Sequence, residues 1–229
     1  MAPRALGLAD KSPRQRAWTL AICTYRALGA VAIITAISYQ VAHESSRTAF
    51  HAANYFSYFT ELSNLFAAAI LLYMASHMHR PRSATTELLR GAAVLYMLTT
   101  GIVYAVLLSG HGVSLPWVNT IVHRVMPAVL VLDWICDPPS VAISMRQARW
   151  WLAFPVIYFV YTLARGPIVH WYPYEFLDPR LSGGYPRVLA NAVGIAVGQI
   201  LMSLLILRLA GRVRTIRERD TRDARALDG

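Results

Sequence analysis

Residues 188–209, VLANAVGIAVGQILMSLLILRL, form one of the apolar runs that decide the fold of this chain. A bilayer core about 30 Å thick is crossed by a helix of roughly 20 apolar residues, and this run has that length with Arg208 as its one charged residue. Five other stretches are similarly long and apolar: 18–41, 55–76, 91–108, 117–136 and 150–169. We therefore predict an all-α fold, a polytopic membrane protein built as a six-transmembrane-helix bundle.

The composition leaves little room for anything else. Of the 229 residues, 56% are hydrophobic and 15% are charged, whereas a soluble domain carries about 25% charged residues. Six spans and their short connections occupy almost the whole chain, so any activity must come from the bundle and its loops. The predicted organisation is an N-terminal tail of residues 1–17, a transmembrane domain of residues 18–209 and a basic C-terminal tail of residues 210–229.

The net charge of +10 is a topology signal, because of where the basic residues fall. Most lie in the N-terminal tail, in the second and fourth connections and after residue 207, all of which alternate spans place on one side. Only Arg47, Arg180 and Arg187 fall in connections on the other side. Since Lys and Arg are enriched in cytoplasmic loops, we expect N-in/C-in topology, with both tails cytoplasmic, in a multi-pass protein of the cell membrane. The C-terminal tail is expected to contact membrane lipids, and no nucleic-acid partner is expected.

Four of the predicted spans carry polar residues at one depth, one to two turns below the outer surface. Polar and ionisable groups inside a span are costly and mark candidate functional sites. These residues are Thr60 and Glu61 in the second span, Asn119, His123 and Arg124 in the fourth, Thr162 and Arg165 in the fifth, and Asn191 in the sixth. Their convergence, more than any single residue, indicates a site.

Spacing within the spans groups these residues further. Thr60 and Asn64 are four residues apart and share a helix face, whereas Glu61 points about 100° away. Asn119 and His123 are also four apart, so Asn119 could orient the imidazole through a hydrogen bond. Pro127 follows His123 by four residues, which frees a backbone carbonyl beside the site and favours a kink.

These residue types permit nucleophilic catalysis. A threonine hydroxyl becomes a good nucleophile when an adjacent base removes its proton, and a neutral histidine can do this and later protonate a leaving alcohol. We therefore expect Thr60 as nucleophile and His123 as base. The expected substrate-binding or oxyanion contacts are Asn64, Asn119, Arg165 and Asn191, with Arg124 as a further oxyanion candidate.

Each of these residues also has a structural interpretation. A threonine in a membrane helix usually bonds back to its own helix, and a lone histidine more often packs inside a bundle than reacts. Glu61 could balance an arginine or set the tautomer of His123. Near the cytoplasmic side, Arg26 and Asp133 are expected to form a structural ion pair, since a charge inside a bundle needs a partner.

Two further expectations concern partners and cofactors. Gly194 and Gly198 form a GxxxG-like pair, which favours close helix contact either within the bundle or between two copies in a homo-oligomer. No metal and no organic cofactor is expected, and b-type haem is not expected because His123 is the one histidine deep in a span.

Three short motifs carry a resemblance to a known family. They are Phe59-Thr60-Glu61-Leu62-Ser63-Asn64, then Trp117-Val118-Asn119-Thr120-Ile121-Val122-His123 with Pro127 and Asp133-Trp134 beyond it, and Tyr172-Pro173-Tyr174-Glu175-Phe176-Leu177-Asp178. In order and spacing, over essentially all six spans, the chain resembles the prokaryotic six-transmembrane branch related to the animal androgen-induced and androgen-dependent TFPI-regulating membrane hydrolases.

The resemblance implies an activity and two site residues. The animal members hydrolyse fatty acid esters of hydroxy fatty acids with a membrane-embedded threonine and histidine, which correspond here to Thr60 and His123. The chain departs from them in having Glu61 and a Leu-Ser-Asn run where they are more apolar, and in the position of the proline after His123. A lipid ester is therefore the expected substrate, but not necessarily the ester that the animal proteins hydrolyse.

Two other functions stay open on the sequence alone. The outer polar layer could be the binding vestibule of a transporter or channel-like protein, which inverted repeats or broken helices would support. The chain could also be a membrane scaffold without chemistry, in which case Thr60 and His123 would not face each other.

Overall fold

The structure of the protein, a computed structural model, describes residues 12–46, 50–109 and 115–227. These residues form helices, turns and loops, and none of them lies in a strand. The longer helices are α1 (Pro13–Ser45), α3 (Phe59–Ser76), α4 (Ala84–Val103), α6 (Met126–Cys136), α8 (Ala153–Val169) and α9 (Tyr185–Leu227). The short ones are α2 (Ala52–Tyr55), η2 (Tyr104–Leu108), α5 (Pro116–Thr120), η3 (Ile121–Val125), α7 (Met145–Ala148), η4 (Arg149–Leu152) and η5 (Glu175–Leu177).

Six continuous helical stretches among the described residues are long and apolar enough to cross a membrane. They are Pro13–Ser45, Phe59–Ser76, Ala84–Leu108, Pro116–Cys136, Met145–Val169 and Tyr185–Arg212. Each overlaps one predicted run, which confirms the all-α, six-helix bundle. The second span begins at Phe59 and not at residue 55, because Tyr58 is extended and separates α3 from the short α2.

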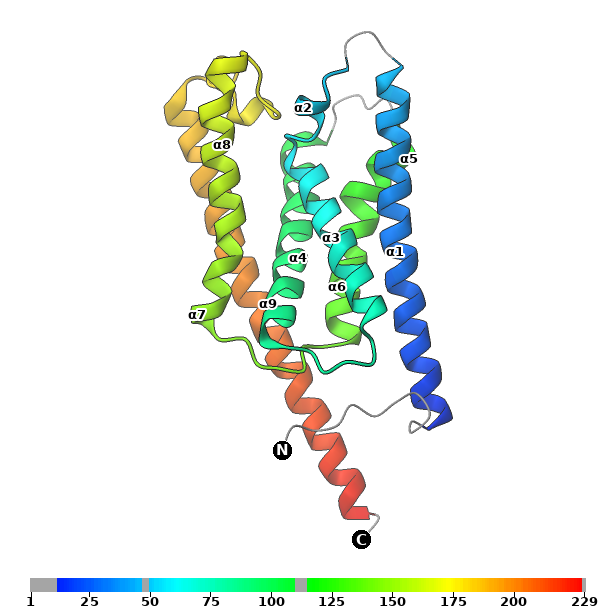
Figure 1. Ribbon diagram of the computed structural model, residues 1–229. Coiled ribbons are helices and arrows are strands. Elements are labelled where there is room, and N and C mark those ends of the chain that lie inside the picture. The colour runs from blue at the N-terminus through cyan, green and yellow to red at the C-terminus, as the bar shows by residue number, and fades with distance from the viewer. Residues whose placement is uncertain (1–11, 47–49, 110–114, 228–229) are drawn as a thin grey trace.

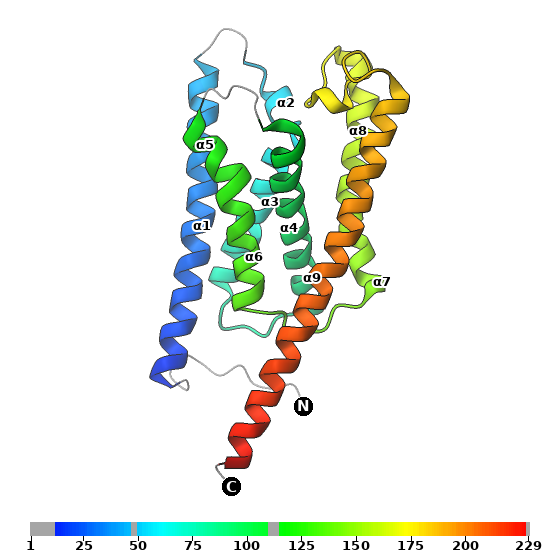
Figure 2. The same ribbon diagram turned by 180° about the vertical axis from the view of Figure 1, so that it is seen from behind.

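The helices divide into a tight group and an outlying pair. α1 packs along α3, α3 packs on α4, and α4 contacts both α6 and α9. α8 and α9 lie side by side at the edge of the bundle opposite α1, as both views show (Figures 1 and 2). We call the end where α1 begins and α3 ends the basal end, and the end where α1 ends and α3 begins the apical end.

Small residues allow α1 and α3 to approach each other closely. Ala30 of α1 and Ala67 of α3 are fully buried, together with Ile33, whereas Ala36 is buried beside Val118 and Val122. A methyl group on Gly29 would lie 3.2 Å from the Leu71 side chain, so glycine lets the helices meet here without displacing Leu71. The outward faces carry exposed apolar residues, among them Val106, Ile157, Ile168 and Leu201, as expected of helices that face lipid tails.

A network of buried charges joins the helices at the basal end. This basal charge cluster consists of Arg26, Arg82, Glu87, Arg90, Asp133 and Asp137. Arg26 Nε lies 2.6 Å from Asp133 Oδ1, which confirms the predicted pair. Arg90 bonds the other oxygen of Asp133 at 2.7 Å and Glu87 at 2.8 Å. The three cations and three acids balance, so the cluster ties α1, α4 and α6 together without net charge.

The two glycines of the GxxxG-like pair lie on α9. A methyl group on Gly194 or Gly198 would meet nothing within 4 Å in the described part of the chain. These glycines therefore do not serve a close contact between helices of the bundle. The other expectation, a contact between two copies of the chain, stays a prediction.

Candidate active site

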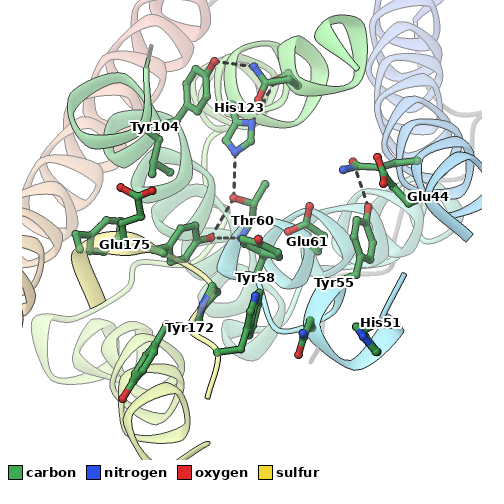
Figure 3. Close-up of a pocket in the computed structure, with 18 of the residues that line it drawn as sticks. Glu44, His51, Tyr55, Tyr58, Thr60, Glu61, Tyr104, His123, Tyr172 and Glu175 are labelled. Carbon is green, nitrogen blue, oxygen red and sulfur yellow. Dashed lines mark hydrogen bonds between the residues drawn. The ribbon is translucent and has the colours of Figure 1, made fainter. Parts of the chain in front are cut away.

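A cavity of about 890 Å³ lies at the apical end of the bundle. Its wall is formed by α1, α2, the first turn of α3, η2, η3 and the loop between α8 and α9 (Figure 3). Thr60, Glu61, Asn119 and His123 of the predicted polar layer line it, together with aromatic side chains. The structure therefore brings the second and fourth spans together where the sequence predicts a site.

Thr60 and His123 are in hydrogen-bond contact inside this cavity. Thr60 Oγ1 lies 3.1 Å from His123 Nε2, as the dashed line in Figure 3 marks. The other ring nitrogen, Nδ1, lies 3.2 Å from the backbone carbonyl of Asn119. Because a carbonyl oxygen can only accept, Nδ1 carries the proton and Nε2 is left to accept the threonine hydroxyl. This is the arrangement that general-base activation of a nucleophile requires.

Local irregularity of the helices sets the position of His123. The segment Ile121–Val125 is π-helical, and Met126 N–H bonds Ile121 five residues back. Pro127 lacks the N–H that would bond the His123 carbonyl in a regular helix. A methyl on Gly101 would lie 3.1 Å from the Pro127 ring and 3.3 Å from that carbonyl, so α4 packs closely against the irregular turn. Single π turns of this kind occur often at functional sites.

A second π turn holds the ring that stacks on the imidazole. Tyr104 lies in the π-helical segment Tyr104–Leu108, which continues α4. Its ring stacks on His123 with centroids 4.3 Å apart and an interplanar angle of 25°. The Tyr104 hydroxyl also accepts a 2.6 Å hydrogen bond from the side chain of Asn119. His123 is therefore held by Asn119 through its backbone and by Tyr104 through its ring.

Tyr174, which belongs to one of the three motifs quoted above, is a further polar neighbour of Thr60, and the sequence analysis gives it no role at the site. Its hydroxyl oxygen accepts a hydrogen bond from Thr60 N–H at 3.3 Å and lies 3.4 Å from Thr60 Oγ1. Desolvation in the cavity, and then the nearby Glu61 carboxylate, raise the pKa of Tyr174. The phenol therefore stays protonated at neutral pH and keeps an O–H for donation.

Asn64 joins the two helices that carry the pair. Its Nδ2 donates to the Thr60 carbonyl at 2.9 Å and to the Val122 carbonyl at 3.2 Å. The side chain is completely buried. These two hydrogen bonds hold the helical turn of Thr60 against Val122, the residue before His123. Asn64 itself does not line the cavity.

The remaining predicted contacts stand behind the cavity wall. Arg165 donates to Asn54 Oδ1 at 2.6 Å and stacks over Trp171, and Asn191 donates to the Phe176 carbonyl at 3.0 Å. Arg124 is exposed and stacks over Tyr104. None of the three lines the cavity with Thr60. Their side chains bond to or stack on residues of the cavity wall. They lie at the level of the site along the bundle, but the rotation of their helices points them away from the centre of the cavity.

A smaller apolar cavity of about 160 Å³ adjoins the first. It lies between α4, α8 and α9 and extends to Gln199. Both cavities are lined by Thr60, Tyr174, Phe176 and Leu108. Thr60 therefore stands at the boundary between a polar and an apolar space.

No group of three His, Cys, Asp or Glu side chains among the described residues is arranged to hold a metal ion. Comparisons of the chain with known protein families, with curated proteins and with solved structures find no match. What the site can do is therefore argued from its own geometry.

Proposed function

We propose that the protein is an intramembrane hydrolase of lipid esters that uses Thr60 as nucleophile and His123 as general base. The observation that carries the proposal is the 3.1 Å contact between Thr60 Oγ1 and His123 Nε2 at the wall of a large cavity. The tautomer of His123 supports it, because Nε2 faces the hydroxyl as an acceptor. The resemblance to the androgen-induced membrane hydrolases points to the same two residues.

The reaction follows from the positions of these groups. Thr60 Oγ1 attacks the ester carbonyl carbon while its proton moves to His123 Nε2. The Tyr174 O–H, 3.4 Å from the nucleophile, donates to the oxyanion that forms. The bond to the alcohol then breaks as His123 returns the proton to the leaving oxygen. Water, deprotonated by His123, cleaves the acyl-threonine, releases the fatty acid and restores both residues.

The two adjoining cavities suit an amphiphilic ester. The apolar cavity beside Thr60 receives the acyl chain, and the large polar cavity receives the alcohol portion. With both tails in the cytoplasm, as the charge distribution predicts, the cavity faces the outer leaflet of the cell membrane. Lipid would then enter laterally, at about the depth of an ester linkage.

The test is labelling of purified protein with a fluorophosphonate probe, together with hydrolysis of a branched fatty acid ester. Wild type is compared with Thr60→Ala and His123→Ala, and with Thr120→Ala as a matched control. Thr120 is exposed and bonds back to the Pro116 carbonyl, so it represents an ordinary helix threonine. Labelling and turnover should be lost in the two site variants and kept in the control. Folded wild type that neither labels nor hydrolyses would refute the proposal.

A second candidate function has one observation in its favour. The cavity lies at the apical end, whereas the basal end is closed by the buried charge cluster, as in a transporter that faces one side of the membrane. In that case Thr60→Val should keep solute uptake into proteoliposomes. The hydrolase proposal predicts that the same variant loses turnover completely.

A further inference from the structure

The carboxylate of Glu61 is a polar group of the apical cavity that neither the fold nor the proposed reaction uses. The residue is 7% exposed and lines the cavity. Its Oε2 atom is buried and has no hydrogen-bond partner in the described chain. A carboxylate in such surroundings is costly unless a cation or a donor compensates it. The position is therefore suited to a group that a ligand brings.

The described part of the cavity wall supplies no lysine or arginine side chain to neutralise the Glu61 carboxylate. The acidic residues that line this part of the wall are Glu44, Glu61 and Glu175. Two arginines stack over rings of the wall, Arg165 over Trp171 and Arg124 over Tyr104, with 5.4 and 5.7 Å between the guanidinium carbon and the ring centroid, and neither lines the cavity.

Aromatic rings that line the same cavity lie at steep angles to one another. Tyr58 meets Trp171 edge to face with centroids 5.5 Å apart and planes at 82°, and it meets Tyr174 at 5.5 Å and 76°. Figure 3 shows Glu61 near Thr60, with Tyr55 and Tyr58 also close by. Aromatic faces close to a carboxylate are the groups that hold ammonium ligands in proteins.

We propose that the apical cavity binds the ammonium group of a cationic ligand, held by Glu61 and by the ring of Tyr58. The inference rests on the proposed function, which it deepens by naming the substrate class: an ester whose alcohol portion carries a primary or quaternary ammonium. An ester that ends in a free carboxylate would bring a second negative charge against Glu61. The site therefore selects against anionic esters of the kind that the animal family hydrolyses.

The experiment measures binding, so that it does not depend on turnover. Thr60→Ala protein, which lacks the nucleophile, is reconstituted in nanodiscs and titrated calorimetrically with empty nanodiscs as reference. The probes are choline and its uncharged isostere 3,3-dimethyl-1-butanol, which share shape and differ in charge. Lauroylcholine and the laurate ester of 3,3-dimethyl-1-butanol repeat the comparison with an acyl chain attached.

We expect choline to bind at least about tenfold more tightly than its isostere, and Glu61→Gln in the Thr60→Ala background to remove that preference. Asp178→Asn is the matched control, since Asp178 pairs with Arg180 at 2.6 Å and lies outside the cavity. It should leave the preference intact. Tighter binding of lauroylcholine than of choline identifies a lipid as the source of the ammonium, and equal binding identifies a free solute.

Equal affinity for the charged and uncharged probes, or no binding of either, would overturn the inference without needing any Glu61 variant to fold. So would an unchanged preference in folded Glu61→Gln protein. The two proposals fail separately. Fluorophosphonate labelling of wild type without charge preference refutes the ammonium site alone, whereas charge preference without labelling or turnover refutes the hydrolase alone.

Discussion

Asn64 donates a hydrogen bond to the backbone carbonyl of Val122 over 3.2 Å, and so holds the residue next to His123 against the turn that carries Thr60. The contact between Thr60 and His123 depends on two separate helices keeping one relative position. Displacements of about 1 Å between a nucleophile and its base are enough to lower rates a hundredfold. In the proposed reaction, a side chain outside the cavity therefore positions the two residues inside it.

We predict that Asn64→Ala lowers fluorophosphonate labelling by about tenfold to a hundredfold and costs about 1–3 kcal/mol of stability, because two buried carbonyls lose their donor. Trp134→Phe is the control. It removes the buried hydrogen bond from Trp134 to the Ile206 carbonyl, away from the site. Labelling rates and melting temperatures of both variants check the prediction, and equal labelling of the two would contradict a positioning role for Asn64.

Tyr174→Phe should lower the turnover number about a hundredfold or more while leaving KM nearly unchanged, since the O–H is needed when the oxyanion forms. Tyr172→Phe removes a hydroxyl from the same loop, on a ring that stacks with Arg180 and does not bond Thr60. Steady-state kinetics of the two variants separate the effects. A loss of the same size in Tyr172→Phe would assign the effect to the loop and not to the Tyr174 hydroxyl.

Asp133→Ala should destabilise the fold by about 3–5 kcal/mol, because it leaves Arg26 and Arg90 buried without their shared acid. Asp178→Asn breaks a pair whose arginine is 54% exposed and should cost less than about 1 kcal/mol. Unfolding in bicelles or by steric trapping measures both. A small effect at Asp133 would show that water reaches the cluster.

The acid limb of the stability curve should depend on Asp137. Burial opposes its charge, but Arg82, Arg90 and Arg26 outweigh burial and hold the pKa of this carboxyl below its usual value of 3.8. A lowered folded-state pKa means that the stabilisation is complete above about pH 4 and is lost as the pH falls through the folded value. Melting temperatures from pH 3 to pH 7 should decline only at the acidic end, and Asp137→Asn should flatten that decline.

The sequence contains enough information to predict the bundle and the two central residues of the site. Runs of apolar residues long enough to cross a bilayer give the six helices directly. Depth below the surface follows from the topology, which is why Thr60 and His123 could be grouped before their contact was known. The Arg26–Asp133 pair follows from the same reasoning about buried charge.

Other parts of the site could not be predicted from the depth of a residue in the membrane alone. Arg165 and Asn191 lie at the right level, but rotation around a helix axis turns them behind the wall. Tyr174 lies on a loop, whose path is set by tertiary contacts and not by periodicity. Arg90 is counted among the basic residues of a cytoplasmic connection, yet it is 2% exposed and bonded to Glu87 and Asp133. Arg90 is thus part of the topology signal in the sequence and a buried ion-pair partner in the fold.

The basal charge cluster and the apical cavity occupy opposite ends of the same helices. Ion pairs hold α1, α4 and α6 together at the end away from the proposed reaction. Substitutions in the cavity wall therefore leave intact the ion pairs that hold these helices together. With this division, substitutions around Thr60 and His123 can change what the cavity binds while the bundle keeps its fold.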